Sequence, residues 1–116
     1  MELNAEVPKD IQEKAYEALE LAKKSGKLKK GTNEVTKAVE RGTAKLVLVA
    51  KDVNPKEIVM HLPALCEEKD IPLVTFPTKE ELGNVAGLNV PTAAVAIIQE
   101  GEAKQAIKEL HSKLKA

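Results

Sequence analysis

The stretch that decides the fold is LVLVA at residues 46–50, five apolar residues in succession. A strand with one buried face would alternate apolar and polar residues, so an unbroken apolar run is typical of a strand covered on both faces. Two further runs share this character, LVTF at residues 73–76 and AVAII at residues 94–98. The sequence therefore predicts a central sheet with helices on both sides.

Helical patterns separate the three apolar runs. Apolar residues recur at helical spacing, and capping residues, prolines and glycines mark where helices begin and end. The expected helices run from Pro8 to Gly26, from Gly31-Thr32 to Gly42, from Asn54-Pro55 through Ile58, Leu62, Leu65 and Cys66 with a bend or interruption at Pro63, from Thr78 to Gly87, and from Gly101 to Leu114.

Helices that alternate with buried strands predict a three-layer α/β/α sandwich. The length of 116 residues fits a single domain over residues 1–116. Short crossovers favour parallel neighbours, although a mixed arrangement is also compatible with the pattern. We expect a central mixed sheet of about four strands.

The charge is segregated along the chain although its total is zero. Residues 23–45 contain eight basic and two acidic side chains, a balance of +8 − 2 = +6, so the remainder carries −6. Attraction of a polyanion depends on such a local field rather than on the total. The simpler interpretation is a lysine-rich, solvated loop between two helices.

Rare residue types exclude most enzyme classes. Cys66 is the single cysteine, and with His61 and His111 it is too sparse for a zinc cluster. The chain has no glycine-rich phosphate loop, and two aromatic residues are too few for stacking single-stranded bases. We expect no catalytic residue, cofactor or metal, and a reducing cytoplasm as the setting.

The segment KGTNEVTKAVER at residues 30–41 is the most informative for function. Helical spacing places four polar residues on one side of the helix: Asn33, Glu34, Lys37 and Arg41. The apolar residues Val35, Ala38 and Val39 lie on the other side. A carboxylate would repel phosphate, yet it accepts hydrogen bonds from guanine N–H groups, as lysine donates to guanine O6 or N7. Purine readout and a soluble helix with a Glu34–Lys37 ion pair are equally compatible with the spacing.

The segment GLNVPTA at residues 87–93 has no regular period but carries Leu88 and Val90. Exposed apolar side chains in a loop indicate a contact surface, which beside nucleic acid would cover a displaced nucleotide. The alternative, that both side chains tuck into the core, is the one that the sequence alone favours.

Several motifs together resemble a known family. They are KGTNEVTK at residues 30–37, Arg41-Gly42, residues 44–52, HLP at 61–63 with CEE at 66–68, Leu82-Gly83 and Ala86-Gly87. The chain resembles the archaeal large-subunit ribosomal protein L7Ae family over roughly residues 8–112. The resemblance implies the α/β/α sandwich expected above and binding to kink-turns, which are RNA duplexes bent at a bulge beside tandem sheared G·A pairs.

The resemblance also implies roles for individual residues. Asn33, Glu34 and Lys37 would contact guanines of the sheared pairs, with Lys30 and Arg41 near phosphates and Gly31 and Thr32 offering backbone donors. The bulged and extruded nucleotides would be contacted by Ile58, Lys79, Leu88, Asn89, Val90, Pro91 and Ala93. Asn54 and Val90 depart from family patterns that have an acidic residue and an arginine there.

By the same resemblance, the partners would be structured RNAs and the proteins that dock on them. The RNAs would be ribosomal RNA, box C/D and H/ACA guide RNAs and ribonuclease P RNA, with the free protein a monomer and no membrane involved. Two alternatives remain open. One is a small α/β enzyme using His61 as a base, and the other is a protein-interaction scaffold that docks through loop 88–93.

Overall fold

A four-stranded sheet in the order β1-β4-β2-β3 forms the centre of the computed structural model, which describes residues 9–52 and 61–115. Its strands are β1 (Lys27–Lys30), β2 (Leu46–Ala50), β3 (Leu73–Phe76) and β4 (Ala94–Gln99). All five residues of β2 are buried, and β2 lies between β3 and β4. The strand expected to be covered on both faces therefore occupies the interior of the sheet.

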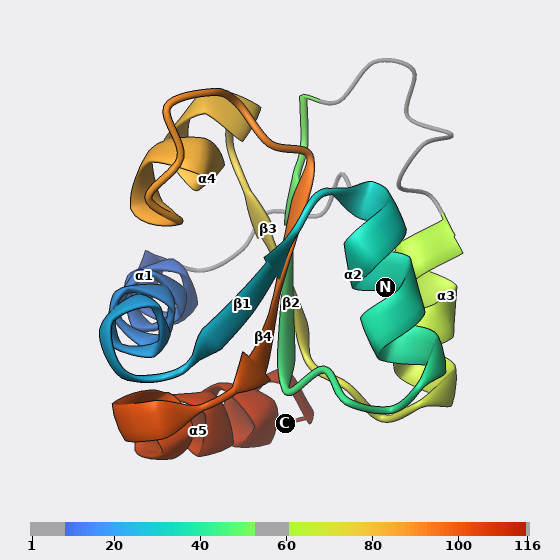
Figure 1. The fold of residues 1–116 in the computed structure, drawn as a ribbon. Coiled ribbons are helices and arrows are strands. Elements are labelled where there is room, and N and C mark those ends of the chain that lie inside the picture. The colour runs from blue at the N-terminus through green and yellow to red at the C-terminus, as the bar shows by residue number, and fades with distance from the viewer. Residues whose placement is uncertain (1–8, 53–60, 116) are drawn as a thin grey trace.

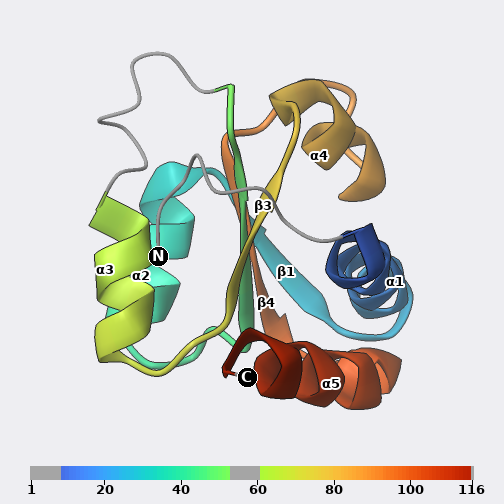
Figure 2. The same cartoon turned by 180° about the vertical axis from the view of Figure 1, so that it is seen from behind.

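Helices cover both faces of this sheet (Figure 1). Helices α2 (Thr32–Glu40) and α3 (His61–Glu68) pack on one face. The other face is covered by α1 (Lys9–Ser25), α4 (Lys79–Val85) and α5 (Lys104–Lys115), as the view from behind also shows (Figure 2). The predicted three-layer α/β/α sandwich is confirmed.

The sheet is mixed in direction. Strand β2 runs parallel to β3, with Val47 opposite Leu73, whereas β4 is antiparallel to both of its neighbours. Consequently the carboxyl ends of β1, β2 and β3 and the beginning of β4 lie at one end of the sheet. This end receives the loops that follow or precede those strands.

Strand β1 is the element that the sequence interpretation missed, because its KLKK sequence was assigned to a lysine-rich loop. It is an edge strand paired only with β4, and its three lysines are exposed while Leu28 packs against the core. An edge strand needs little hydrophobic surface, and lysines there discourage pairing with a second chain. A strand of this kind carries almost no hydrophobic signal.

The third predicted helix is described only from His61 onward. Leu62 and Cys66 are buried and Leu65 is partly buried, as expected, and α3 continues through Pro63 without interruption. The predicted cap at Asn54-Pro55 and the predicted burial of Ile58 lie outside the described residues. Within the described ranges, no helix combines the length and apolar character needed to cross a bilayer.

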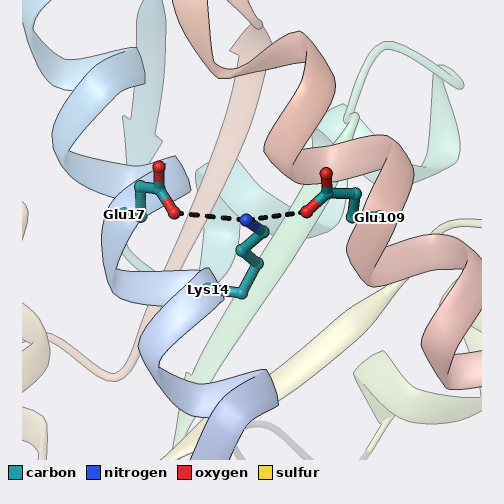
Figure 3. A network of polar contacts seen from close by, with 3 residues as sticks. All are labelled: Lys14, Glu17 and Glu109. Atoms are coloured by element: carbon teal, nitrogen blue, oxygen red, sulfur yellow. Dashed lines mark ion pairs between the residues drawn. The ribbon is translucent and has the colours of Figure 1, made fainter.

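An ion-pair network joins the first and last helices (Figure 3). Lys14 Nζ of α1 lies 2.7 Å from Glu109 Oε2 of α5 and 3.5 Å from Glu17 Oε2. The hydrogen bond to Glu109 raises the pKa of Lys14 above its ordinary value. This small stabilisation is therefore complete below the ordinary lysine pKa and is lost as pH rises through the raised one.

The side chain of Thr78 caps the start of α4, as predicted. Thr78 is extended, and its Oγ1 accepts a hydrogen bond from the Glu81 N–H at 3.1 Å. We expect Thr78→Ala to lower the free energy of unfolding by about 1 kcal/mol because this N–H loses its acceptor. Urea unfolding followed by circular dichroism measures the change. Thr78→Ser keeps the hydroxyl, and an equal loss in that variant would contradict the capping account.

Candidate nucleic-acid interface

Helix α2 presents a polar face to solvent. Val35, Ala38 and Val39 are buried against the sheet, whereas Asn33, Glu34, Lys37 and Arg41 are exposed. This is the division expected from their spacing. Three hydrogen-bonding side chains thus lie along one accessible helix of nine residues, and Arg41 follows at its C-cap.

The beginning of α2 is fixed to the sheet through its backbone. Gly31, at the N-cap, has φ 96° and ψ 148°, a conformation that favours glycine, and its N–H donates to the Ala94 carbonyl oxygen at 2.9 Å. No side chain caps this helix start. The backbone N–H groups of the first turn and the positive end of the helix dipole therefore suit an anion such as phosphate.

Glu34 and Lys37 form a loose ion pair. Lys37 Nζ lies 3.9 Å from Glu34 Oε1, and the side chains are 59% and 49% exposed. At this exposure such a pair contributes about 0.3–0.5 kcal/mol or less, because solvent screens it. Both groups consequently keep hydrogen-bonding capacity for a partner.

Loop 88–93 and the start of α4 lie at the same end of the sheet as the start of α2 (Figure 1). The loop of residues 88–93 is held to β2, since the Ala50 N–H donates to the Ala93 carbonyl at 2.9 Å, and to α4, since the Thr92 N–H donates to the Lys79 carbonyl at 3.1 Å. The Lys79 N–H in turn donates to Asp52 Oδ1 at 2.7 Å. Lys79, loop 88–93 and the start of α2 therefore lie at one end of the sheet, although α2 and α4 cover its opposite faces.

Asp52 has a role that the sequence interpretation missed. Asp52 lies two residues after the end of β2, and its carboxylate accepts the first N–H of α4, so it fixes where Lys79 lies. An acidic residue just after a strand gives no indication of which helix start it will meet. Ile58, assigned to the extruded nucleotide, lies outside the described residues.

Loop 88–93 exposes more apolar surface than the sequence alone favoured. Val90 is 62% exposed, Asn89 and Pro91 are exposed, and Leu88 and Ala93 are partly buried. The favoured interpretation, that Leu88 and Val90 both tuck into the core, is therefore wrong for Val90. The reason is that its backbone carbonyl, and not its side chain, packs against α4 at Gly83.

The structure divides the basic segment of residues 23–45. Lys30 lies at the start of α2 and Arg41 at its C-cap. Lys45, in contrast, lines a groove with Glu100 and Ile107 at the opposite end of the sheet, and the Lys23 side chain lies beside Gly87. Therefore only some of the basic residues of segment 23–45 lie near the polar face of α2.

His61 joins the two helices on the α2 face of the sheet. Its Nε2 lies 2.7 Å from Thr36 Oγ1, and that hydroxyl donates to the Thr32 carbonyl oxygen at 2.8 Å. One hydroxyl, Thr36 Oγ1, therefore ties His61 of α3 to α2.

The fold and this surface define a small α/β protein whose exposed polar helix and apolar loop suit recognition of a structured partner. The sequence matches the model of the ribosomal protein L7Ae/L30e/S12e/Gadd45 family over residues 13–107, so the chain belongs to this family. The fold also superimposes on a solved structure titled "Giardia lamblia 15.5kD RNA binding protein". The two chains have a TM-score of 0.88 and 30% sequence identity, over 97% of this chain and 94% of the other.

These similarities confirm the predicted family and the prediction that the protein is not an enzyme. The alternative of a small α/β enzyme that uses His61 as a base is thereby set aside. An archaeal origin and a place in the large ribosomal subunit remain predictions.

Proposed function

We propose that this protein binds RNA and stabilises kink-turns through the surface formed by α2, Lys79 and loop 88–93. The observation that carries the proposal is an exposed hydrogen-bond acceptor, Glu34, between cationic neighbours on a helix beside an exposed apolar loop. A surface that bound phosphate alone would gain nothing from that carboxylate. Family membership and the similar RNA-binding protein of Giardia support the same conclusion.

Helix α2 reads base edges in this proposal. Glu34 accepts N–H groups of guanine, Lys37 donates to guanine O6 or N7, and Asn33 does either. Lys30 and Arg41, at opposite ends of the helix, lie along the phosphate backbone. The N–H groups of Gly31 and Thr32 supply further donors to phosphate.

Loop 88–93 contributes apolar contacts rather than charged ones. Leu88 and Val90 pack over the bulged nucleotides, together with Asn89, Pro91 and Ala93. Lys79, fixed by Asp52, approaches the extruded nucleotide from the start of α4, and Ile58 is assigned to the same nucleotide. Apolar contact with unstacked bases is a common mode of RNA recognition.

The protein bends the RNA by binding one of the conformations that the free RNA already adopts. A free kink-turn exchanges between an extended and a bent form, and a protein that fits only the bent form shifts that population by its difference in affinity. Bending brings phosphates together, so cations on the protein relieve their repulsion.

A bending measurement tests this proposal directly. Two fluorophores at the ends of the RNA stems report their separation by energy transfer. We expect transfer to rise on addition of the protein for an RNA with a bulge and tandem G·A pairs, and to stay constant for a fully paired duplex of the same length. Binding without a rise in transfer would contradict the proposed mechanism.

Lys30→Ala should weaken binding through electrostatics alone. If about 4 phosphates are neutralised, the slope of log K against log salt is roughly −3, and the loss of one contact makes it shallower by about 0.7–0.9. The measurement is a titration at several salt concentrations. Lys45→Ala is the matched control because Lys45 lies at the opposite end of the sheet, and an equal change in its slope would contradict the assignment.

The wider setting follows the family. We propose that the single domain of residues 1–116 serves ribosomal RNA, box C/D and H/ACA guide RNAs or ribonuclease P RNA in the cytoplasm. The free protein would be a monomer, and partner proteins would dock on the bent RNA complex. RNAs recovered after crosslinking in cells would test which of these particles contain it.

A further inference from the structure

The backbone of loop 88–93 rests on α4 at Gly83. Gly83 is buried in the middle of α4, and its carbonyl accepts the Leu88 N–H at 2.8 Å. A methyl group at Gly83 would collide with the Val90 carbonyl oxygen and lie 3.2 Å from the Val90 carbonyl carbon and 3.3 Å from Pro91 Cα. The glycine therefore lets the backbone of the loop lie directly on the helix.

Gly83 is needed for space and not for its own conformation. It is an interior residue of α4, and it is not among the residues of positive φ. In such a place alanine normally favours the helix over glycine. Here any side chain would push the loop away, because the nearest atoms are backbone atoms that cannot rotate aside.

The loop is tied to α4 a second time. The Thr92 N–H donates to the Lys79 carbonyl at 3.1 Å, and the buried Thr92 Oγ1 donates to the Ala94 carbonyl at 3.2 Å. Between these two contacts, side chains do not fill the space that separates the loop from α4. A groove of about 250 Å³ runs along this space, and it is lined by Glu80, Asn84, Asn89, Val90 and Pro91. Backbone contact thus holds the tip of the loop in place.

We propose that Gly83 is a positioning residue that sets how much affinity the protein gains from the bulge of its RNA. This inference rests on the proposed function of loop 88–93. A loop already held in its binding conformation loses little entropy when RNA docks on it. If the loop is displaced from α4, Leu88 and Val90 must be ordered at the moment of binding, whereas α2 keeps its contacts to the G·A pairs.

The test compares two RNAs that share tandem G·A pairs, one with a bulge and one without. For Gly83→Ala we expect about tenfold weaker binding to the bulged RNA, the cost of ordering two side chains, and unchanged binding to the other. Hydrogen exchange supplies a readout in the free protein. The Leu88 amide, bonded to Gly83 in the wild type, should exchange faster in the variant.

Asn84→Ala is the matched control, because Asn84 is the next residue of α4 and its side chain is exposed. It should keep the wild-type ratio of the two affinities. Pro91→Gly loosens the same loop–helix contact from the loop side without adding atoms to the core. Because Pro91 is itself assigned to the bulge, this variant should both lower the ratio and speed exchange of the Leu88 amide in the free protein.

The outcomes separate the two proposals. An unchanged ratio in Gly83→Ala, an equal loss on both RNAs, or an unchanged ratio in Pro91→Gly would overturn the role of Gly83. A wild-type protein that does not prefer the bulged RNA would instead contradict the proposed function.

Discussion

Replacement of Glu34 by alanine should weaken binding to an RNA with tandem G·A pairs by about 1–3 kcal/mol, or roughly 5- to 150-fold, while binding to a plain duplex stays the same or improves. The side chain is 49% exposed, and its ion pair with Lys37 is loose. Removing a negative charge strengthens attraction to phosphate by simple electrostatics. A fall in affinity therefore has the opposite sign from the charge effect and identifies a lost hydrogen bond to a base.

Glu40→Ala is the control for this prediction. Glu40 is the last residue of the same helix, is exposed, and lies about 9 Å from Glu34 along the axis. Its removal changes the net charge equally, so affinity for both RNAs should rise slightly or stay constant. Isothermal titration calorimetry with each RNA measures the difference. Equal behaviour of the two variants would show that Glu34 acts only through charge.

Cys66 should react with a thiol reagent about a thousandfold more slowly in the folded protein than in urea. The side chain is 1% exposed, and burial raises the pKa of the thiol from 9.0 to about 12. The reactive thiolate is thus scarce at neutral pH. A cysteine introduced at the exposed Ser112 in a Cys66→Ala background is the comparison. Labelling of Cys66 at the same rate as that exposed thiol would contradict its burial.

The same shift makes stability depend on pH in alkaline solution. The folded protein holds the thiol proton more tightly than the unfolded chain, because the folded pKa of Cys66 is the higher one. Its contribution is complete below pH 9.0 and is lost as pH rises toward about 12. In this range the unfolding free energy of Cys66→Ala should fall less steeply than that of the wild type.

Interior elements were predictable from sequence because their signals are hydrophobic. The run at 46–50 is apolar throughout since β2 is covered on both faces, and α2 shows its buried stripe of Val35, Ala38 and Val39 at helical spacing. The cap at Thr78 was predictable because the hydrogen bond is local, three residues along the chain. Such features depend on neighbours in sequence.

Features set by distant contacts were not predictable. Strand β1 has little apolar surface and is defined by its pairing with β4, some 70 residues away as the register of Lys27 with Gln99 shows. The apolar side chain of Val90 predicted a core residue. The side chain is exposed because the backbone carbonyl of Val90, and not its side chain, packs against Gly83. Asp52 gave no signal of its bond to the start of α4.

For the candidate site, the chemistry of α2 could be formulated from residue types and spacing, but its target could not. Spacing alone was equally compatible with a solvated helix and with purine readout. The bulge contacts assigned to Leu88, Val90 and Lys79 came from the resemblance to L7Ae proteins. The structure adds their common location. Hydrogen bonds from the N–H groups of Gly31, Ala50 and Thr92 hold the start of α2, loop 88–93 and the start of α4 at one end of the sheet.

The most direct test of base readout is the affinity of the wild-type protein for two bulged RNAs that differ only in the pairs beside the bulge. One carries two consecutive G·A pairs, and in the other these are Watson–Crick pairs. The readout account predicts about 100-fold tighter binding to the first, as expected for two discriminating contacts. Equal affinity for the two RNAs would contradict it.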